Sequence, residues 1–238
     1  MPFADLKALL FDVFGTVVDW RSSVIAAGDA LGRAHGFQVD WPRFADEWRR
    51  DGYLGGIERI RRGEAPWTTV DALHRAKLDE LLPRYGVLGL NADEIERFNR
   101  VWHRLAPWPD AVPGLSRLRR RFILSTFTNG GFALITNLAR HAGLPWDCII
   151  TADLFRVYKP APAFYRGAVE LLALRPEEAM LVAAHPYDLA AARGHGLRTA
   201  FVPRPLEFGP NAPPEAPPEG GVDLVAADFL DLAAKLGA

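Results

Sequence analysis

The chain has 238 residues, of which 49% are hydrophobic, and its formal net charge is −1. This length suits one full core with a smaller appended domain, and the scattered basic residues predict neither a nucleic-acid partner nor a membrane surface. The start of the chain, MPFADLKALLF, lacks a cationic leader and an apolar signal core, and no apolar run approaches the ~20 residues that span a bilayer. We therefore expect a cytoplasmic protein.

The first predicted strand, ALLFDVF (8–14), contains a carboxylate, Asp12, inside an apolar run. Removing a carboxylate from water is costly, so Asp12 is either a structural turn residue or a reactive group that has partners. Residues 21–107 differ in character from this strand, because apolar residues recur there at helical spacing with Trp, Arg and Glu between them. This pattern predicts an all-helical insertion.

One segment of the insertion, WPRFADEWRRDGY (41–53), contains two adjacent arginines. Its aromatic residues at helical spacing predict a stripe that packs inward. Arg50 has acidic residues three and four positions before it, at Glu47 and Asp46, and these predict ion pairs on the solvated face. Arg49 shares its helical row with Ala45 and Tyr53 and lies beside the apolar stripe. It is therefore the candidate for a functional arginine, although most helix arginines are surface ions.

The insertion ends at APWPDAVPG (106–114), whose three prolines predict an extended connection back to the sheet. Later strands are predicted at FILSTF (122–127), CIITA (148–152), AMLVAA (179–184), TAFV (199–202) and VDLVAA (222–227).

These strands alternate with helical patterns, which predicts an α/β fold with a doubly wound, mostly parallel, Rossmann-like sheet. Residues 1–20 and 108–238 would form this core, and 21–107 a second, helical domain. PRPLEFGPNAPPEAPPEGG (203–221) predicts a stiff surface connection, with a binding role as the alternative.

Polar residues follow four of the predicted strands. Ligands of open α/β sheets bind beyond the carboxyl ends of the strands, so we expect these side chains to meet at one rim. They are Asp12, Thr16, Thr128, Asn129, Lys159, His185 and Asp188.

FDVFGT, followed by TNG, YKP and the aspartate of YDLAAA in this order, resembles the haloacid dehalogenase superfamily. The resemblance covers nearly the whole chain, with the helical insertion as a cap domain. Most members are magnesium-dependent phosphatases that place a second aspartate two residues after the first. Here that position is Phe14, which can neither protonate a leaving group nor bind a metal. The segment AAHPYD keeps only Asp188, and this leaves too few oxygen ligands for magnesium.

Both departures favour the branch of type II L-2-haloacid dehalogenases, which the chain also resembles in VYKP followed by Tyr165. The resemblance implies a hydrolase acting on carbon-halide bonds. It would convert short (S)-2-haloalkanoic acids to 2-hydroxyacids through an aspartyl ester, as a homodimer that needs no cofactor and no metal. A magnesium-dependent small-molecule phosphatase and a catalytically weak, carboxylate-binding relative remain alternatives.

The resemblance implies a role for each residue around the nucleophile, Asp12. Thr16 would hold one carboxylate oxygen, unless it only caps the following segment. Val13 would contact the substrate. Asp188 would activate water, unless it only caps a helix. Tyr165 would brace Lys159 or Asp188, with core packing as the alternative.

Other residues would receive the substrate anion and the leaving halide. Lys159 would supply positive charge and Thr128 a hydroxyl for the substrate carboxylate. Asn129 would donate to the halide, with turn capping as the alternative. The Trp-Arg pair of the family's cap helix selects Arg49 as the guanidinium that accepts the halide.

The segment Ala183-Ala184-His185 departs from the family, which usually has Ser-Ser-Asn or Ala-Ser-Asn there. His185 is either structural or part of the halide pocket, where a protonated ring would donate to the leaving ion. A strongly donating pocket would favour the small, basic fluoride. We therefore include fluoroacetate among the candidate substrates.

Overall fold

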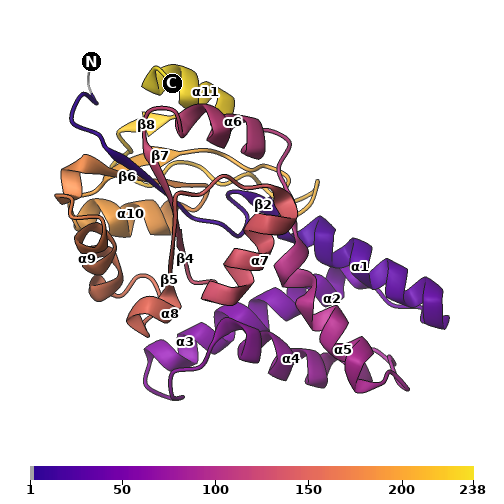
Figure 1. Ribbon diagram of the computed structural model, residues 1–238. Helices are drawn as coiled ribbons and strands as arrows, with labels where there is room; N and C mark the ends of the chain where they lie inside the picture. The colour runs from indigo at the N-terminus through magenta and orange to yellow at the C-terminus, as the bar shows by residue number, and fades with distance from the viewer. Residues whose placement is uncertain (1–2) are drawn as a thin grey trace. The chain divides into compact units, whose positions relative to one another are not determined.

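The structure is a computed structural model that describes residues 3–238, and the chain divides into two compact units. One unit takes the chain up to Asp19 together with Ala106–Ala238, and the other is Trp20–Leu105 (Figure 1). Within the described range, no helix combines the length and the apolar character that a membrane crossing requires.

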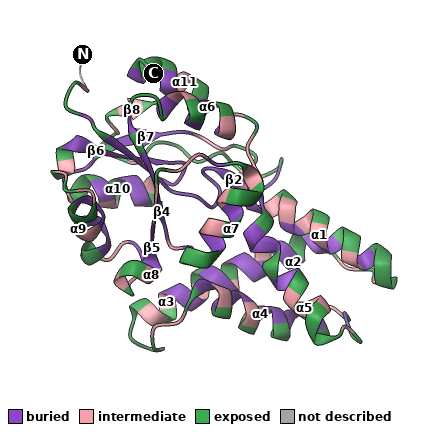
Figure 2. Ribbon diagram, in the orientation of Figure 1, coloured by how far each residue is buried: buried purple, intermediate pink, exposed green. Residues whose placement is uncertain are grey.

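The first unit is built on a six-stranded parallel sheet, and this confirms the predicted fold class. Near its centre, strand β1 (Ala8–Phe11) pairs with β4 (Ile123–Thr128) on one side and with β6 (Ala179–Ala183) on the other. All four residues of β1 are fully buried. Figure 2 shows the buried strands between more exposed helices. In sheet order the strands are β5 (Cys148–Thr151), β4 (Ile123–Thr128), β1 (Ala8–Phe11), β6 (Ala179–Ala183), β7 (Arg198–Phe201) and β8 (Leu224–Val225).

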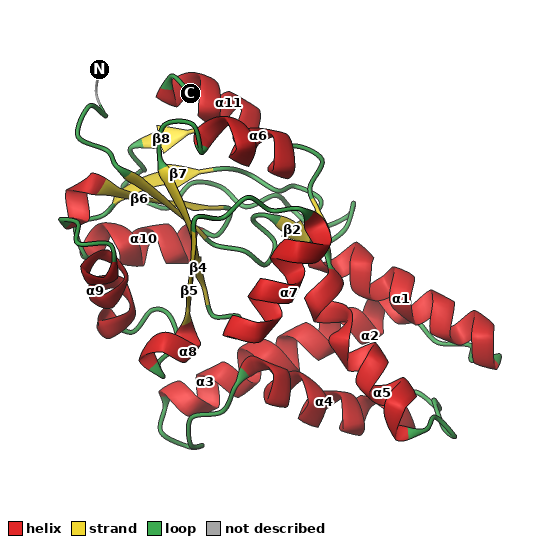
Figure 3. Cartoon of the chain, in the orientation of Figure 1, coloured by secondary structure: helices red, strands yellow, loops and turns green. Residues whose placement is uncertain are grey.

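Helices lie between and after the strands of this unit (Figure 3). They are α6 (Ala111–Leu118), α7 (Phe132–Ala142), α8 (Ala152–Phe155), α9 (Pro162–Leu171), the 3₁₀ turn η3 (Pro176–Glu178), α10 (Pro186–Gly194) and α11 (Phe229–Leu236). Helices α6 and α11 lie side by side, and Gly114 allows this approach because a Cβ there would lie 2.4 Å from the Cβ of Phe229.

The connection predicted to be extended over 106–114 is extended only at β3 (Ala106–Pro107), which pairs antiparallel with β2 (Val18–Asp19). Helix α6 begins at Ala111, so the prediction was wrong for the end of the segment. Pro113 lies in the first turn of the helix, where the backbone N–H has no partner within the helix and its loss costs little.

The second unit is made of helices. They are α1 (Trp20–His35), α2 (Trp41–Glu47), the π-helix η1 (Trp48–Leu54), α3 (Gly55–Arg61), α4 (Val70–Arg84), α5 (Ala92–Asn99) and the 3₁₀ helix η2 (Arg100–Arg104). The predicted aromatic stripe is buried, and the ring of Phe44 meets Trp41 and Trp48 edge-on at centroid distances of 5.3 and 5.8 Å.

The ion pairs predicted for Arg50 are wrong. Arg50 donates to Asp51 at 2.7 and 3.0 Å, whereas Asp46 pairs with Arg21 and Glu47 accepts from Arg43. The π-helix explains the difference, because its wider turns change which side chains lie above one another.

Candidate active site

The carboxylate of Asp12 lies directly beyond the central strand. Its backbone N–H donates to the carbonyl of Val182 on β6 at 3.1 Å, and the residue is 7% exposed. The hydroxyl of Thr16 donates to Oδ2 of Asp12 at 2.8 Å and itself accepts the N–H of Ala184 at 3.0 Å. The turn between them contains Gly15 at φ +88°, a conformation that L side chains rarely adopt. The end of β1 thus fixes one oxygen of a buried carboxylate.

Lys159 lies in the segment between α8 and α9 and is 6% exposed. Its Nζ donates to Oδ1 of Asp12 at 3.0 Å, to the carbonyl of Phe127 at 2.9 Å and to Asp188. An ammonium group has three N–H donors, and these contacts use all of them. Lys159 therefore joins the two carboxylates, and it offers a substrate its charge rather than a hydrogen bond.

The pKa values of this pair follow from their contact. Burial alone would raise the pKa of Asp12, but Lys159 and His185 outweigh burial and hold it below its ordinary 3.8. Burial alone would lower the pKa of Lys159, but Asp12 and Asp188 raise it. Asp12 is therefore an ionised carboxylate at neutral pH, as a nucleophile must be.

Asp188 lies in the first turn of α10 and is almost completely buried. The hydroxyl of Tyr165, on α9, donates to its Oδ1 at 2.7 Å. Burial raises the pKa of Asp188, and the nearby charge of Asp12 adds to this, while Lys159 opposes both. A carboxylate with a raised pKa is a better proton acceptor, which suits the predicted role in activating water.

His185 follows β6 and precedes α10, and it is 4% exposed. Its Nδ1 lies 2.9 Å from Oδ2 of Asp12, and its Nε2 lies 3.0 Å from a carboxylate oxygen of Glu207. Burial alone would lower the pKa of His185, but Glu207 and Asp12 raise it to about 10. Both ring N–H groups are thus committed to carboxylates. This contradicts the prediction that the protonated ring donates to the leaving halide.

Glu207 was not predicted as a site residue from the sequence. It lies in the segment predicted to be a surface connection, but it is only 1% exposed. The flanking Leu206 and Phe208 are exposed, so the prediction is wrong for the acid between them. The available signal was its position after β7, whose carboxyl end belongs to the same rim as those of β1 and β6.

Three further predicted residues lie around these groups. The side-chain oxygen of Asn129 accepts the backbone N–H of Lys159 at 2.7 Å, which orients the amide and leaves its NH₂ group as the donor. The hydroxyl of Thr128 accepts the N–H of Gly130 at 3.0 Å and keeps its own proton to donate. Val13 is buried, and its carbonyl accepts from the turn that follows.

Arg49 belongs to the helical unit and is 6% exposed. Its guanidinium carbon lies 4.7 Å from the ring centroid of Trp20 and 5.2 Å from that of Tyr53. Burial and the charges of Arg49 and His103 lower the pKa of His74 well below its usual value, so that ring is neutral. The two aromatic faces attract the buried cation. The predicted role as halide acceptor remains a prediction.

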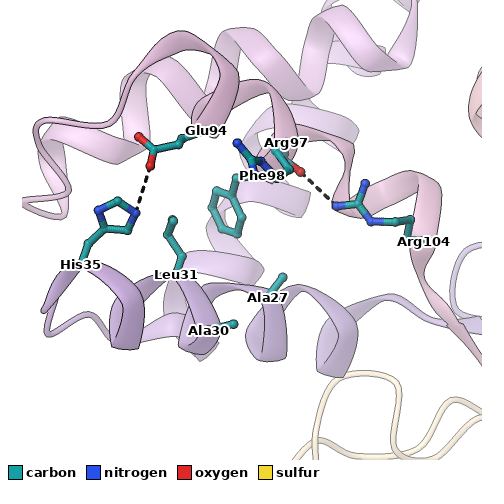
Figure 4. A pocket seen from close by; sticks show the side chains of 8 residues that line it. All are labelled: Ala27, Ala30, Leu31, His35, Glu94, Arg97, Phe98 and Arg104. Carbon is teal, nitrogen blue, oxygen red and sulfur yellow. Dashed lines mark hydrogen bonds and ion pairs between the residues drawn. The ribbon is translucent and has the colours of Figure 1, made fainter.

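The helical unit also has a surface hollow of about 290 Å³ between α1 and α5 (Figure 4). Apolar side chains form one part of its wall, and an ion pair between His35 and Glu94 at 3.3 Å lies at its edge. The side chain of Arg104 is turned to the carbonyl of Arg97. Three of its polar side chains are thus already paired, and none of the predicted site residues lines this hollow.

Among the described residues, one cluster has the composition of a metal site. Potential ligand atoms of His185, Glu207 and Glu215 lie within 4.8 Å of one another. A protonated imidazole has no lone pair for a metal, and carboxylates on both sides of His185 favour that form. The cluster therefore fits a charged hydrogen-bonded pair better than a metal centre.

Comparisons with known proteins identify the family of this chain. The model of the haloacid dehalogenase-like hydrolase family matches residues 6–196. The (S)-2-haloacid dehalogenase of Xanthobacter autotrophicus is 30% identical over 210 residues, which cover 84% of this chain and 76% of that protein. The crystal structure of the L-2-haloacid dehalogenase PA0810 is 47% identical with a TM-score of 0.93, over 98% of this chain and 99% of that one. The crystal structure of the defluorinating L-2-haloacid dehalogenase Rha0230 has 42% sequence identity and a TM-score of 0.93, over 98% of this chain and 96% of that one.

Proposed function

This chain belongs to the haloacid dehalogenase-like hydrolases, and from that membership we propose that it hydrolyses the carbon-halogen bond of short (S)-2-haloalkanoic acids. The products would be the 2-hydroxyacid and a halide ion. Fluoroacetate is proposed among the substrates, because one of the similar solved structures is that of a defluorinating enzyme.

The reaction would proceed in two displacements. Oδ1 of Asp12 attacks the carbon that bears the halogen, and the halide leaves with the bonding electron pair. The ester that results is hydrolysed by water, from which Asp188 accepts a proton. Thr128 and the NH₂ group of Asn129 are the proposed donors to the substrate carboxylate and to the halide, and the charge of Lys159 favours the approach of an anion.

A single observation carries this proposal over the phosphatase alternative. Asp12 is buried and ionised between Lys159 and His185, while the position of the second acid is occupied by Phe14, which is 2% exposed. A benzyl side chain supplies neither a proton for a phosphate leaving group nor an oxygen ligand for magnesium. The carboxylate can still displace a halide from carbon, because that step requires no proton.

Halide release tests the function directly. We expect chloride, bromide and fluoride release from 2-chloropropionate, bromoacetate and fluoroacetate, unchanged by EDTA, with the (S) form of 2-chloropropionate consumed and the (R) form left. The same preparation should not hydrolyse p-nitrophenyl phosphate in the presence of magnesium. Magnesium-dependent phosphate release without halide release would establish the phosphatase instead.

Replacing Arg49 tests the proposed halide acceptor. We expect Arg49→Met to lower kcat/KM for 2-chloropropionate by about a hundredfold, the usual cost of removing one donor to a developing anion. Arg50→Met is the matched control, because Arg50 is exposed and pairs with Asp51. Equal rates for both variants would remove Arg49 from the mechanism.

Homodimer formation and a cytoplasmic location are also proposed, on the resemblance to the family. Light scattering on the purified chain, and fractionation of the cells that produce it, measure the two properties.

A further inference from the structure

The segment between β7 and β8 brings a buried acid to the far side of His185. Oε1 and Oε2 of Glu207 lie 3.2 and 3.0 Å from Nε2 of the ring. The acid reaches this position because residue 15 is glycine, since a Cβ there would lie 2.0 Å from Oε1 of Glu207. Arg204 fixes the start of the segment by donating to the carbonyl of Thr16 at 2.9 Å and to Asp110 at 2.7 and 2.9 Å.

Two donors converge on one oxygen of Asp12. The hydroxyl of Thr16 and Nδ1 of His185 lie 2.8 and 2.9 Å from Oδ2, while Lys159 contacts Oδ1. Because both nitrogens of His185 face carboxylates, both carry protons. The two oxygens of Asp12 therefore have different surroundings, and Oδ2 is the one that stays in place when Oδ1 reacts.

We propose that the Thr16 hydroxyl and the Nδ1–H of His185 form the oxyanion hole for hydrolysis of the Asp12 ester, and that Glu207 is the positioning residue that holds the ring charged and aimed at Oδ2. This rests on the proposed dehalogenase function, whose ester intermediate it requires.

The second displacement hydrolyses the ester at Asp12. Water adds to Cγ of Asp12, one of its protons passes to Asp188, and the π electrons of the carbonyl move to Oδ2. The oxyanion collapses, and the bond between Cγ and Oδ1 breaks. Oδ1 leaves with the substrate carbon and takes the proton from Asp188 to give the 2-hydroxyacid. The carboxyl group of Asp12 now holds the water oxygen, and it loses its remaining proton to solvent.

The same donors affect the two displacements in opposite ways. In the first, Asp12 gives up negative charge, so donors to Oδ2 stabilise the reactant more than the transition state. In the second, negative charge grows on Oδ2, where the donors already point, and only an interaction that is stronger in the transition state speeds a step. Weakening the His185–Glu207 pair should therefore slow ester hydrolysis and not ester formation.

Several charged and titratable groups surround the ring of His185. Those that face it are Asp12 beyond β1, Glu207 and Glu215 of the segment after β7, Tyr187 of α10, whose ring stacks at 5.6 Å, and Lys159 behind Asp12. The acids predominate around the ring, and its pKa rises to about 10. With glutamine at position 207 one of these acids is gone, and the ring should lose its proton at lower pH.

The test is rapid-quench kinetics of Glu207→Gln with (S)-2-chloropropionate. We expect a burst of about one halide per active site, followed by a steady state about 10- to 100-fold slower than that of the original protein. Mass spectrometry should find the ester on the peptide that contains Asp12. The alkaline limb of kcat should move to lower pH, and Glu207→Asp should restore part of the rate. Glu219→Gln, an exposed acid of the same segment, is the matched control.

The outcomes separate the two proposals. If the burst and the steady state of Glu207→Gln slow equally and no ester is found, the proposed oxyanion hole is wrong, but the proposed dehalogenase function stands. Unchanged kinetics in Glu207→Gln would lead to the same conclusion. No halide release by the original protein would overturn the proposed function itself. If the variant does not fold, the original protein gives the answer. Its ester must accumulate as the pH rises and the ring of His185 loses its proton, at a pH below about 10 because esterified Asp12 no longer carries the charge that helps raise this pKa. An ester level independent of pH between about 7 and 10 contradicts the proposal.

Discussion

The Asp12→Asn variant is expected to release halide at least about ten thousandfold more slowly than the original protein, the usual effect of removing a nucleophile. An amide nitrogen or oxygen is a poor nucleophile, and it cannot form the ester. The fold should persist, because the amide can still contact Thr16 and Lys159, so circular dichroism should be nearly unchanged. The measurement is chloride release from (S)-2-chloropropionate. Asp29→Asn, an exposed aspartate on α1, is the matched control.

A single turnover in ¹⁸O-labelled water distinguishes the ester from direct attack by water. The hydroxyl oxygen of the first product molecule should be unlabelled, because it comes from Oδ1 of Asp12. Label should then appear in Asp12 and in the product of later turnovers. Label in the first product, or halide release by Asp12→Asn at a similar rate, would show that water attacks the substrate directly.

The Lys159→Met variant is expected to lose both activity and stability. Removing one partner of a buried ionic cluster leaves uncompensated charge, which costs about 3–5 kcal/mol of unfolding free energy at neutral pH. Halide release should fall about a thousandfold, because Asp12 and Asp188 would repel each other and compete for a proton. Urea unfolding and halide release measure the two effects. Lys7→Met removes a surface lysine that pairs with Glu178 at 2.7 Å, and it should change both little.

The stability loss should depend on pH with a definite sign. In the original protein the pKa of Asp12 lies below 3.8, so its contribution is present above that pH and is lost as the pH falls through the folded-state value. Without Lys159 the carboxylates bind protons more readily, and protonation relieves their repulsion. The difference in unfolding free energy between the original protein and Lys159→Met should therefore be largest at neutral pH and become smaller toward about pH 4.5. A gap that widens in acid would show that Lys159 acts through something other than charge.

Much of the core site could be predicted because parallel strands bring distant residues to one rim. The short apolar runs were sufficient to place Asp12, Asn129 and His185 beyond the carboxyl ends of strands. Their order along the chain then gave the family. Alternation of strands and helices, in turn, was sufficient for the parallel sheet.

Contacts between side chains were harder to predict. The saturated ammonium of Lys159 depends on the carbonyl of Phe127, and no sequence pattern marks a backbone acceptor. The partner of Arg50 changed because a π-helix altered the spacing on which the prediction relied. Glu207 lies in a segment rich in proline and glycine, where neither periodicity nor spacing indicates which single side chain turns inward.

The close approach of Glu207 to residue 15 has a consequence for protein engineering. Histidine grafted alone into a relative that has an amide at that position would face only the carboxylate of the nucleophile, so we expect its pKa to be lower than that of His185 in this chain. The acid cannot be added to a scaffold with any larger residue in the turn, because the two would collide. Gly15, His185 and Glu207 therefore form one transferable unit, and a transplant should carry all three together.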